Sequence, residues 1–387
     1  MAVQVAVGTS RDHDPVAAFA AASHDAHASL GGPCDLAIVF VAAPHLGHAK
    51  DILSIVHERI EPRNLIGCGA AGVLGAGREL ETGPGAAVWA LAAPEAEIST
   101  HHLLTEHGAD GELVVSGLPD PDGAAPEAIV ALCDPHSFSA EALLERLNAE
   151  RPGVPVLGGL ASAAVAGSAS LLRDGEVLDS GAVACSIDGI SILPCVSQGA
   201  IPVGPEMTIT SASGNVIEAL ASLPAVERLR EAIGELSERE QQLASRGLLL
   251  GIVIDPNQPE YLRGDFLVRP IFGADEQRGT IAIGERVRVG QTVRMHVRDA
   301  AAADEDLREA LRTQVLALGP QGAAGALLFT CNGRGSHMFE VPDHDAAAVE
   351  DALSAPAAGF FCAGEIGPVG GRNFLHGFTA TLAVFGR

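Results

Sequence analysis

Runs of apolar residues alternate with amphipathic stretches along the 387-residue chain, and one arrangement of them occurs three times. In each occurrence an apolar strand, an amphipathic helix, a second apolar strand, a glycine-rich turn and a further strand follow one another. Apolar residues in the helices recur every three to four positions, as expected of one buried face. The three helices are predicted at residues 49–62, 139–152 and 343–356.

The strands of this arrangement are continuous apolar runs, which is typical of central strands that are covered on both faces. A strand–helix–strand unit followed by a hairpin strand produces mixed sheets with helices packed against them. We therefore predict an α/β (mixed α+β) fold of repeated strand–helix–strand–hairpin units. Cys68 and Cys362 stand in similar places just before two of the glycine-rich turns, which supports the repeat.

A different kind of sequence separates the second and third occurrences. Residues 224–247 are predicted to form one long amphipathic helix, and residues 304–319 a further helix. Several strands separated by Gly and Asp turns are predicted between them. The segment before this block ends on a proline, so we place a domain boundary near residue 220. The two expected domains are residues 1–220 and 221–387.

The net charge of the chain argues against partners with negatively charged surfaces. The 49 acidic and 24 basic residues give a formal net charge of −25, and such a chain repels nucleic-acid phosphates and anionic lipid surfaces. No apolar run reaches the roughly 18 to 20 residues of a membrane-spanning helix. The first residues also lack the features of a secretory signal. We expect a cytoplasmic protein that binds neither nucleic acid nor membranes.

The sequence indicates no cofactor and no metal. Seven cysteines lie singly in apolar runs without a C-x-x-C pair, so neither a disulfide framework nor a zinc site is indicated. Gly69, Gly72 and Gly75 resemble a dinucleotide fingerprint, but a turn and another strand follow them where a helix is required. The sequence contains neither a P-loop nor an HExxH motif.

Polar residues suited to ligand binding gather in the glycine-rich segment near the end of the sequence. Glu365, Gly367, Arg372, Asn373 and His376 lie there between two apolar strands. Successive backbone amides of such a turn form a concave anion site, and a guanidinium and a carboxylate together complement a zwitterion. The alternative is a Glu–Arg ion pair that closes a tight hairpin.

A second group, Cys331, Arg334, Gly335 and His337, follows directly on an apolar strand. Functional loops of α/β folds gather at the carboxyl ends of strands, so Arg334 is a candidate ligand-recognising cation. Our sharper hypothesis places Arg334 and Glu365 in one pocket for a small polar molecule. The catalytic alternative makes Cys331 a nucleophile and His337 its base, although strand-end cysteines more often serve as buried small hydrophobes.

Several of these segments resemble the FIST domain family. Resemblance to the FIST C-terminal domain is carried by GFFCAGEIGPVGGRNFLHGFTATLAVF (359–385), CNGRGSHMF (331–339) and the strand-rich block at 264–300. Resemblance to the FIST N-terminal domain is carried by LIGCGAAGVLGAGREL (65–80) and VPVLGGLASAA (154–164). It extends from about residue 30 to the end of the sequence.

The resemblance implies a bacterial sensory module of signal transduction that binds small ligands, amino acids among them, without catalysis. It also implies kinship with the FIST region of F-box substrate receptors. The sequence has no F-box-like region, kinase, cyclase or methyl-accepting helix, so a partner signalling protein is expected to supply the output. A protein-interaction scaffold and a Cys/His-dependent transferase or hydrolase are the alternatives.

Overall fold

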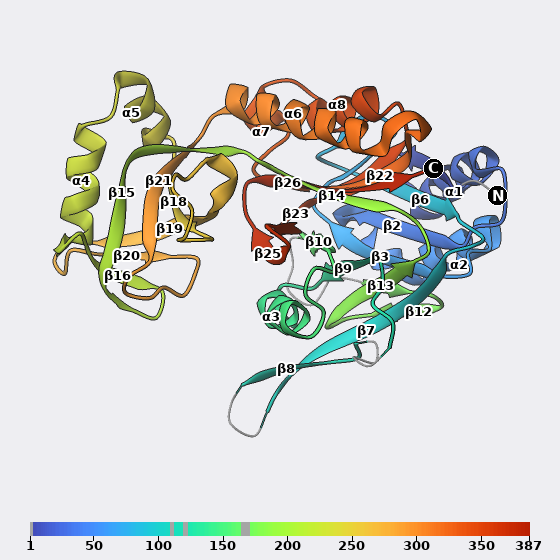
Figure 1. Ribbon diagram of the computed structural model, residues 1–387. Coiled ribbons are helices and arrows are strands. Elements are labelled where there is room, and N and C mark those ends of the chain that lie inside the picture. The colour runs from blue at the N-terminus through green and yellow to red at the C-terminus, as the bar shows by residue number, and fades with distance from the viewer. Residues whose placement is uncertain (1–2, 109–111, 119–122, 164–170) are drawn as a thin grey trace. The chain divides into compact units, whose positions relative to one another are not determined.

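The computed structural model describes residues 3–108, 112–118, 123–163 and 171–387 (Figure 1). These residues form a mixed α/β fold, as predicted. They divide into two compact units that each draw on separated parts of the sequence. Unit 1 comprises Met1–Val196, Arg308–Leu375 and Ala380–Arg387, and unit 2 comprises Ser197–Leu307 and His376–Thr379.

Each compact unit draws on separated segments of the sequence, whereas the two predicted domains are continuous segments. Unit 2 includes residues from both sides of residue 220. The division of the sequence into residues 1–220 and 221–387 therefore stays a prediction.

Three sheets with equivalent strand orders make up most of unit 1. The first has the order β1 (Gln4–Ser10), β6 (Ala86–Ala92), β2 (Leu36–Ala42), β3 (Leu65–Ala70), β11 (Leu171–Arg173) and β12 (Glu176–Leu178). The second has the order β8 (Leu113–Ser116), β7 (Glu97–His107), β13 (Ala182–Asp188), β9 (Ala128–Cys133), β10 (Val156–Leu160), β24 (Glu365–Val369) and β25 (Arg372–His376). The third has the order β14 (Ile192–Gln198), β26 (Thr379–Gly386), β22 (Ala323–Cys331), β23 (Ala357–Cys362), β4 (Val73–Gly75) and β5 (Arg78–Leu80).

These sheets confirm the repeated unit that the sequence predicts. Each holds one parallel pair, β2–β3, β9–β10 or β22–β23. The helices between the paired strands are α2 (Ala49–Ile60), α3 (Ala140–Glu150) and α8 (His344–Leu353). The last strand of each strand–helix–strand–hairpin repeat, β6, β13 or β26, pairs antiparallel with the first strand of its parallel pair. We call residues 36–92, 128–188 and 323–386 repeats 1, 2 and 3.

The hairpin of each repeat leaves its own sheet and joins another. Strands β4 and β5 follow β3 along the chain, but β4 pairs with β23 of repeat 3. Strands β24 and β25 follow β23, but β24 pairs with β10 of repeat 2. Strands β11 and β12 follow β10, but β11 pairs with β3 of repeat 1. Because each sheet contains strands from two repeats, the three repeats are interlocked.

A glycine occupies the same register position in all three parallel pairs. The opposed residues are Val39 and Gly67, Ala131 and Gly158, and Leu328 and Gly359. A Cβ atom on any of these glycines would overlap the carbonyl oxygen of the residue opposite. A side chain at this position would push the paired strands apart, so a shared packing requirement underlies the sequence repeat.

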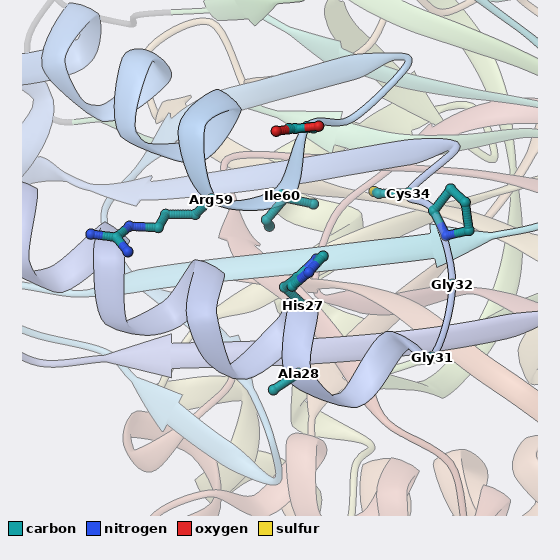
Figure 2. A pocket seen from close by; sticks show the side chains of 9 residues that line it. His27, Ala28, Gly31, Gly32, Cys34, Arg59 and Ile60 are labelled. Carbon is teal, nitrogen blue, oxygen red and sulfur yellow. The ribbon is translucent and has the colours of Figure 1, made fainter.

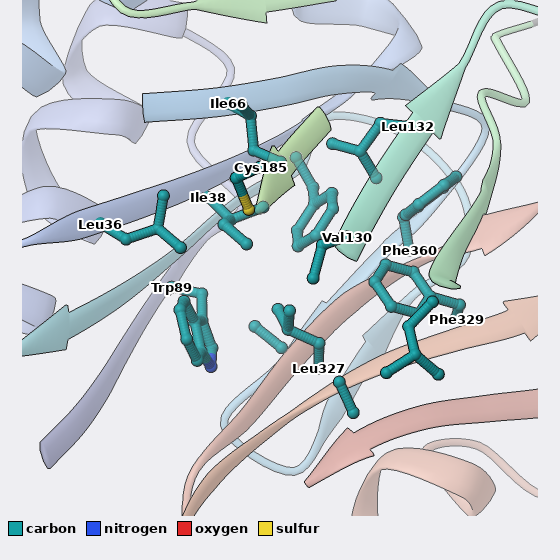
Figure 3. Close-up of a cluster of buried hydrophobic side chains, with 14 of the residues drawn as sticks. Leu36, Ile38, Ile66, Trp89, Val130, Leu132, Cys185, Leu327, Phe329 and Phe360 are labelled. Carbon is teal, nitrogen blue, oxygen red and sulfur yellow. The ribbon is translucent and has the colours of Figure 1, made fainter. Parts of the chain in front are cut away.

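The core of unit 1 lies among the three sheets. Figure 3 shows apolar side chains from all three, including Leu36, Ile38, Trp89, Val130, Leu132, Leu327, Phe329 and Phe360. Alternate residues of β2 face this core, whereas the residues between them pack with helices α1 (Pro15–Leu30) and α2. Strand β2 is therefore buried on both faces, which explains its continuous apolar sequence.

Unit 2 contains an antiparallel sheet that closes on itself. Its strand order is β15 (Ala200–Ser213), β21 (Thr292–Arg298), β18 (Leu248–Val253), β19 (Phe266–Asp275), β20 (Thr280–Ile283), β16 (Val216–Leu220) and β17 (Leu223–Pro224). Strand β15 also pairs with β16, so six of these strands form a closed barrel. Apolar residues of the strands share a core with helix α4 (Ala225–Gly234).

The long helix predicted at residues 224–247 is wrong in one respect, because two helices occupy this region. Helix α4 ends at Gly234, and α5 (Glu238–Ser245) begins after Ser237. The Ser237 hydroxyl accepts a hydrogen bond from the Glu240 amide, and the Glu240 carboxylate accepts one from the Ser237 amide. This capping box starts a new helix at a point where the apolar periodicity runs on without a break and so gives no sign of a helix end.

The remaining helical segments are η1 (Ala43–His48), η2 (Arg263–Asp265), α6 (Ala300–Leu318), η3 (Gly319–Gln321) and α7 (Ser336–Phe339). Helix α6 begins four residues before the helix predicted at 304–319. Within the residues that the structure describes, no helix is both long enough and apolar enough to cross a membrane.

Candidate functional site

The glycine-rich segment near the end of the sequence forms the β24–β25 hairpin. Gly370 and Gly371 occupy its turn with φ angles of 57° and 77°. Positive φ at both central residues is the geometry of a tight hairpin turn, which favours glycine. Glu365 begins β24 and Arg372 begins β25, so these two residues lie at opposite ends of the antiparallel hairpin.

Asn373 anchors this hairpin to repeat 2. Its side-chain oxygen accepts a hydrogen bond from the Val156 amide at 2.8 Å, and its side-chain nitrogen donates to the Val154 carbonyl at 2.9 Å. Asn148 of α3 accepts from the Asn373 backbone amide at 2.8 Å and donates to the Asn373 carbonyl at 2.9 Å. Asn373 is 2% exposed. Its polar groups are engaged in holding β25 against α3 and β10.

The other candidate residues of this hairpin lie in different surroundings. Arg372 is exposed, with its guanidinium 5.8 Å from the ring centre of Phe374. Gly367 packs so closely against Val196 and Thr381 that a Cβ atom would lie 2.7 and 2.8 Å from their side chains. His376 is buried and belongs to unit 2. Arg372, Asn373 and His376 therefore lie on one strand but in different surroundings.

Arg334 is the centre of a buried cluster at the carboxyl end of β22. Its Nε and Nη2 donate to the two carboxylate oxygens of Asp345 at 2.6 and 2.8 Å, and both side chains are fully buried. Thr330 donates a further hydrogen bond to Asp345 at 2.7 Å. Burial alone would raise the pKa of Asp345, but the charge and hydrogen bonds of Arg334 outweigh it and hold that pKa well below its usual range. The guanidinium is thus already paired with a carboxylate.

Two more of the predicted residues lie near Arg334. Glu365, which is fully buried, and Cys331, which is partly buried, both interact electrostatically with the Arg334 guanidinium. Gly335 has a φ of 65° and directly precedes the short helix α7, while His337 is exposed on that helix. The structure therefore brings Cys331, Arg334, Gly335 and Glu365 together.

Glu79, which the sequence did not single out, belongs to the same cluster. It comes from β5 of repeat 1, and its Oε1 accepts hydrogen bonds from the amides of Asp345 and Ala346 at 2.8 and 3.0 Å. Its own amide donates to Asp343 at 2.7 Å. Burial, followed by the negative charge of Asp345, raises the pKa of Glu79 to about 7. Only the exchange of hairpins places Glu79 here, so no local sequence signal identifies it.

An open hollow of about 710 Å³ lies elsewhere in unit 1, where helices α1 and α2 end (Figure 2). Its lining consists of His27, Ala28, Gly31, Gly32, Pro33, Cys34, Arg59, Ile60 and Glu61. A smaller hollow of about 270 Å³ shares the Gly31–Pro33 segment and adds Asp35 and Arg63 to its lining.

Local sequence explains why both helices end at this hollow. Gly31 adopts a left-handed conformation with a φ of 67° after α1, and Pro33 cannot continue a helix. Helix α2 ends at Ile60; the next residue, Glu61, has a φ of 50° and precedes Pro62. Helix C-termini carry partial negative charge. The hollow therefore combines two such termini with the Arg59 guanidinium and the Glu61 carboxylate, a set of groups that complements a zwitterion.

The fold is that of an α/β protein with three interlocked repeats and a closed antiparallel barrel. The family model for the FIST N domain matches residues 35–222, and that for the FIST C domain matches residues 225–368. The chain belongs to the FIST family, as the resemblance implied. FIST domains are generally sensory domains of signal transduction.

Full-length relatives occur in mycobacteria. An uncharacterized protein of Mycobacterium tuberculosis (strain CDC 1551 / Oshkosh) is 44% identical over 387 residues, which cover 100% of both chains. An uncharacterized protein of Mycobacterium bovis (strain ATCC BAA-935 / AF2122/97) is 41% identical over 386 residues, which cover 99% of both chains. This chain is thus similar to those proteins along its whole length.

Proposed function

We propose that this chain is a non-catalytic sensory module that binds a small zwitterionic ligand of the amino-acid class in the hollow between the ends of α1 and α2. The observation that carries the proposal is the hollow itself, whose volume of about 710 Å³ falls in the range of small-molecule sites. Membership of a sensory family supports the same function. A partner signalling protein would convert ligand binding into an output.

The charges around the hollow give the ligand an orientation. Within the part of the chain that the structure describes, Arg59 forms no ion pair, so its guanidinium is available to a ligand carboxylate. Glu61 and the carbonyl ends of the two helices favour the ligand ammonium. A molecule with both groups a few atoms apart would therefore bind better than a simple carboxylate or amine.

The buried cysteines support a non-catalytic role. Six of the seven are buried. Burial raises the pKa of Cys34 and of Cys185 to about 12, and it also raises the pKa of Cys362. A thiol with a raised pKa is a poor nucleophile at neutral pH because little thiolate is present.

Isothermal titration calorimetry with the common amino acids and matched simple amines and carboxylates tests the proposal. We expect an amino acid to bind, and Arg59→Ala to weaken binding at least tenfold without lowering the melting temperature by more than a few degrees. Arg312→Ala, which removes an exposed arginine of α6, is the matched control and should leave affinity unchanged. Absence of binding across the panel, or binding that neither Arg59→Ala nor Glu61→Gln weakens, would overturn the proposal.

A further inference from the structure

Two buried carboxylates, those of Asp345 and Glu79, lie at the start of α8, and only Asp345 pairs with the buried Arg334 guanidinium. Asp345 takes the bidentate contact with Arg334. Glu79 is 4% exposed and has no ion-pair partner among the described residues. Its Oε2 has no hydrogen-bond partner there either, although its Oε1 accepts from two amides at the N-terminus of α8. The two acids therefore face very different electrostatic environments.

Other charged groups around Glu79 do not neutralise its carboxylate. Arg11, at the end of β1, donates to the Glu79 backbone carbonyl at 3.3 Å. Arg78, beside it on β5, pairs with Asp343 at 3.0 Å. Asp345 from α8 and Glu81 from its own segment both disfavour a negative charge on Glu79, while the two amide hydrogen bonds favour it. When two buried acids differ in this way, one ionises and the other retains its proton.

The Glu79 contacts join separate parts of the sequence. Residue 79 lies in the segment matched by the FIST N domain, and residues 343–346 lie in the segment matched by the FIST C domain. A neighbouring contact also joins these two segments, because the Glu81 carboxylate accepts hydrogen bonds from the amide and hydroxyl of Ser336 at 3.0 and 2.8 Å. The β4–β5 hairpin is thus fixed to α7 and α8 largely through carboxylates.

We propose that Glu79 is a proton-responsive latch between the β4–β5 hairpin and helix α8. In its neutral form Glu79 keeps the hairpin docked on α8. Loss of the proton places an unpaired charge beside Asp345 in a buried site and weakens the docking. The latch makes the connection between the FIST N and FIST C segments sensitive to pH near neutrality, independently of any ligand in the hollow between α1 and α2.

The sign of the effect follows from the proton count. The pKa of Glu79 is about 7 in the folded protein and about 4.5 when unfolded, so the folded state binds more protons between these values. Stability is greatest below the lower pKa and falls as the pH rises through the higher one. Between pH 6 and pH 8 the unfolding equilibrium constant is expected to rise about tenfold through this group alone.

Urea denaturation of the wild type and of Glu79→Gln at pH 6, 7 and 8 tests the latch. Glutamine retains an oxygen for the two amides but cannot ionise, so the variant should lose the roughly tenfold pH-dependent increase. Glu58→Gln, which changes an exposed glutamate of α2, should keep the wild-type pH dependence. If Glu79→Gln kept it as well, the proposal would be overturned.

Hydrogen–deuterium exchange of the wild-type protein provides a second test should the variant not fold. After correction for intrinsic exchange rates, protection of residues 73–80 and 343–350 is expected to fall between pH 6 and pH 8. Protection that stays constant in both segments would overturn the proposal that Glu79 is a latch, whatever the outcome of the ligand titrations.

Discussion

The exchanged hairpins of repeats 1 and 3 are anchored by opposite chemistry. Hairpin β24–β25 is held on repeat 2 by the neutral amide of Asn373, which bonds the Val156 amide at the start of β10. Hairpin β4–β5 is held on repeat 3 by the carboxylates of Glu79 and Glu81. One arrangement of strands thus tolerates both a neutral and an ionisable anchor.

Repeat 2 supplies the third case, in which a carboxylate bonds the backbone amide that is equivalent to the one bonded by Asn373. Asp174, in the turn between β11 and β12, accepts a hydrogen bond from the Leu65 amide at the start of β3. Leu65 and Val156 are equivalent first residues of their strands. In repeat 3 the equivalent amide, that of Ala357, is bonded instead by Glu350 of α8. Hairpins β24–β25 and β11–β12 therefore both bond the first amide of the strand on which they dock, whereas hairpin β4–β5 contacts α7 and α8 instead.

Removing the central cation should have the largest effect on this comparison. Arg334→Met leaves Asp345 buried without its partner, and breaking a buried pair in this way costs about 3–5 kcal/mol. We expect urea denaturation to show a loss of that size, or a variant that does not fold. Arg372→Met, which changes an exposed arginine of the neutral hairpin, should cost less than about 0.5 kcal/mol.

The opposite result would support the hypothesis of an Arg334–Glu365 pocket. If Arg334→Met kept the stability of the wild type but lost amino-acid binding, the guanidinium would serve a ligand rather than Asp345. Titration of the same variant by calorimetry separates these two outcomes.

Removing the neutral anchor should have an intermediate effect. Asn373→Ala leaves the Val156 amide and the Val154 carbonyl buried without this partner, and an unsatisfied buried group costs about 1–3 kcal/mol. We expect denaturation to show a loss of about 2–3 kcal/mol. Because an amide does not titrate, the loss should be the same at pH 6 and pH 8. A loss that varied with pH would remove the contrast between the two anchors.

Asn332→Ala is the matched control for this substitution, because Asn332 is an exposed asparagine at the end of β22. It should change the stability by less than about 0.5 kcal/mol.

The repeated unit could be predicted from the sequence because helix periodicity and strand burial are local properties. The three parallel pairs, their helices and the strand-rich block all follow from apolar spacing. The alignment of the repeats could not be placed to the residue. Register equates Gly67 with Gly359, so Cys68 corresponds to Phe360, and Cys362 lies two positions further along its strand. The similar placement of Cys68 and Cys362 is therefore not an equivalence.

The partners of the candidate residues could not be predicted, because they depend on contacts between distant parts of the chain. Arg334 is eleven residues from Asp345, so that pair was within reach of local reasoning. Glu79 lies more than two hundred and sixty residues from Asp345, and only the exchange of hairpins brings them together. The hollow between α1 and α2 depends likewise on how two helices end side by side.

The smallest expected effect comes from the exposed edge of the charged anchor. Arg78 is 71% exposed and pairs with Asp343 at 3.0 Å. Exposed pairs contribute about 0.2–1 kcal/mol, and salt screens them. Arg78→Ala should therefore cost less than about 1 kcal/mol in dilute buffer and almost nothing in about 1 M NaCl, as measured by urea denaturation. A larger cost that persisted in salt would mean that Arg78 stabilises the hairpin by holding Asp343 in place to accept from the Glu79 amide. Arg78, and not the Glu79 carboxylate, would then be the main charged contact between the hairpin and α8.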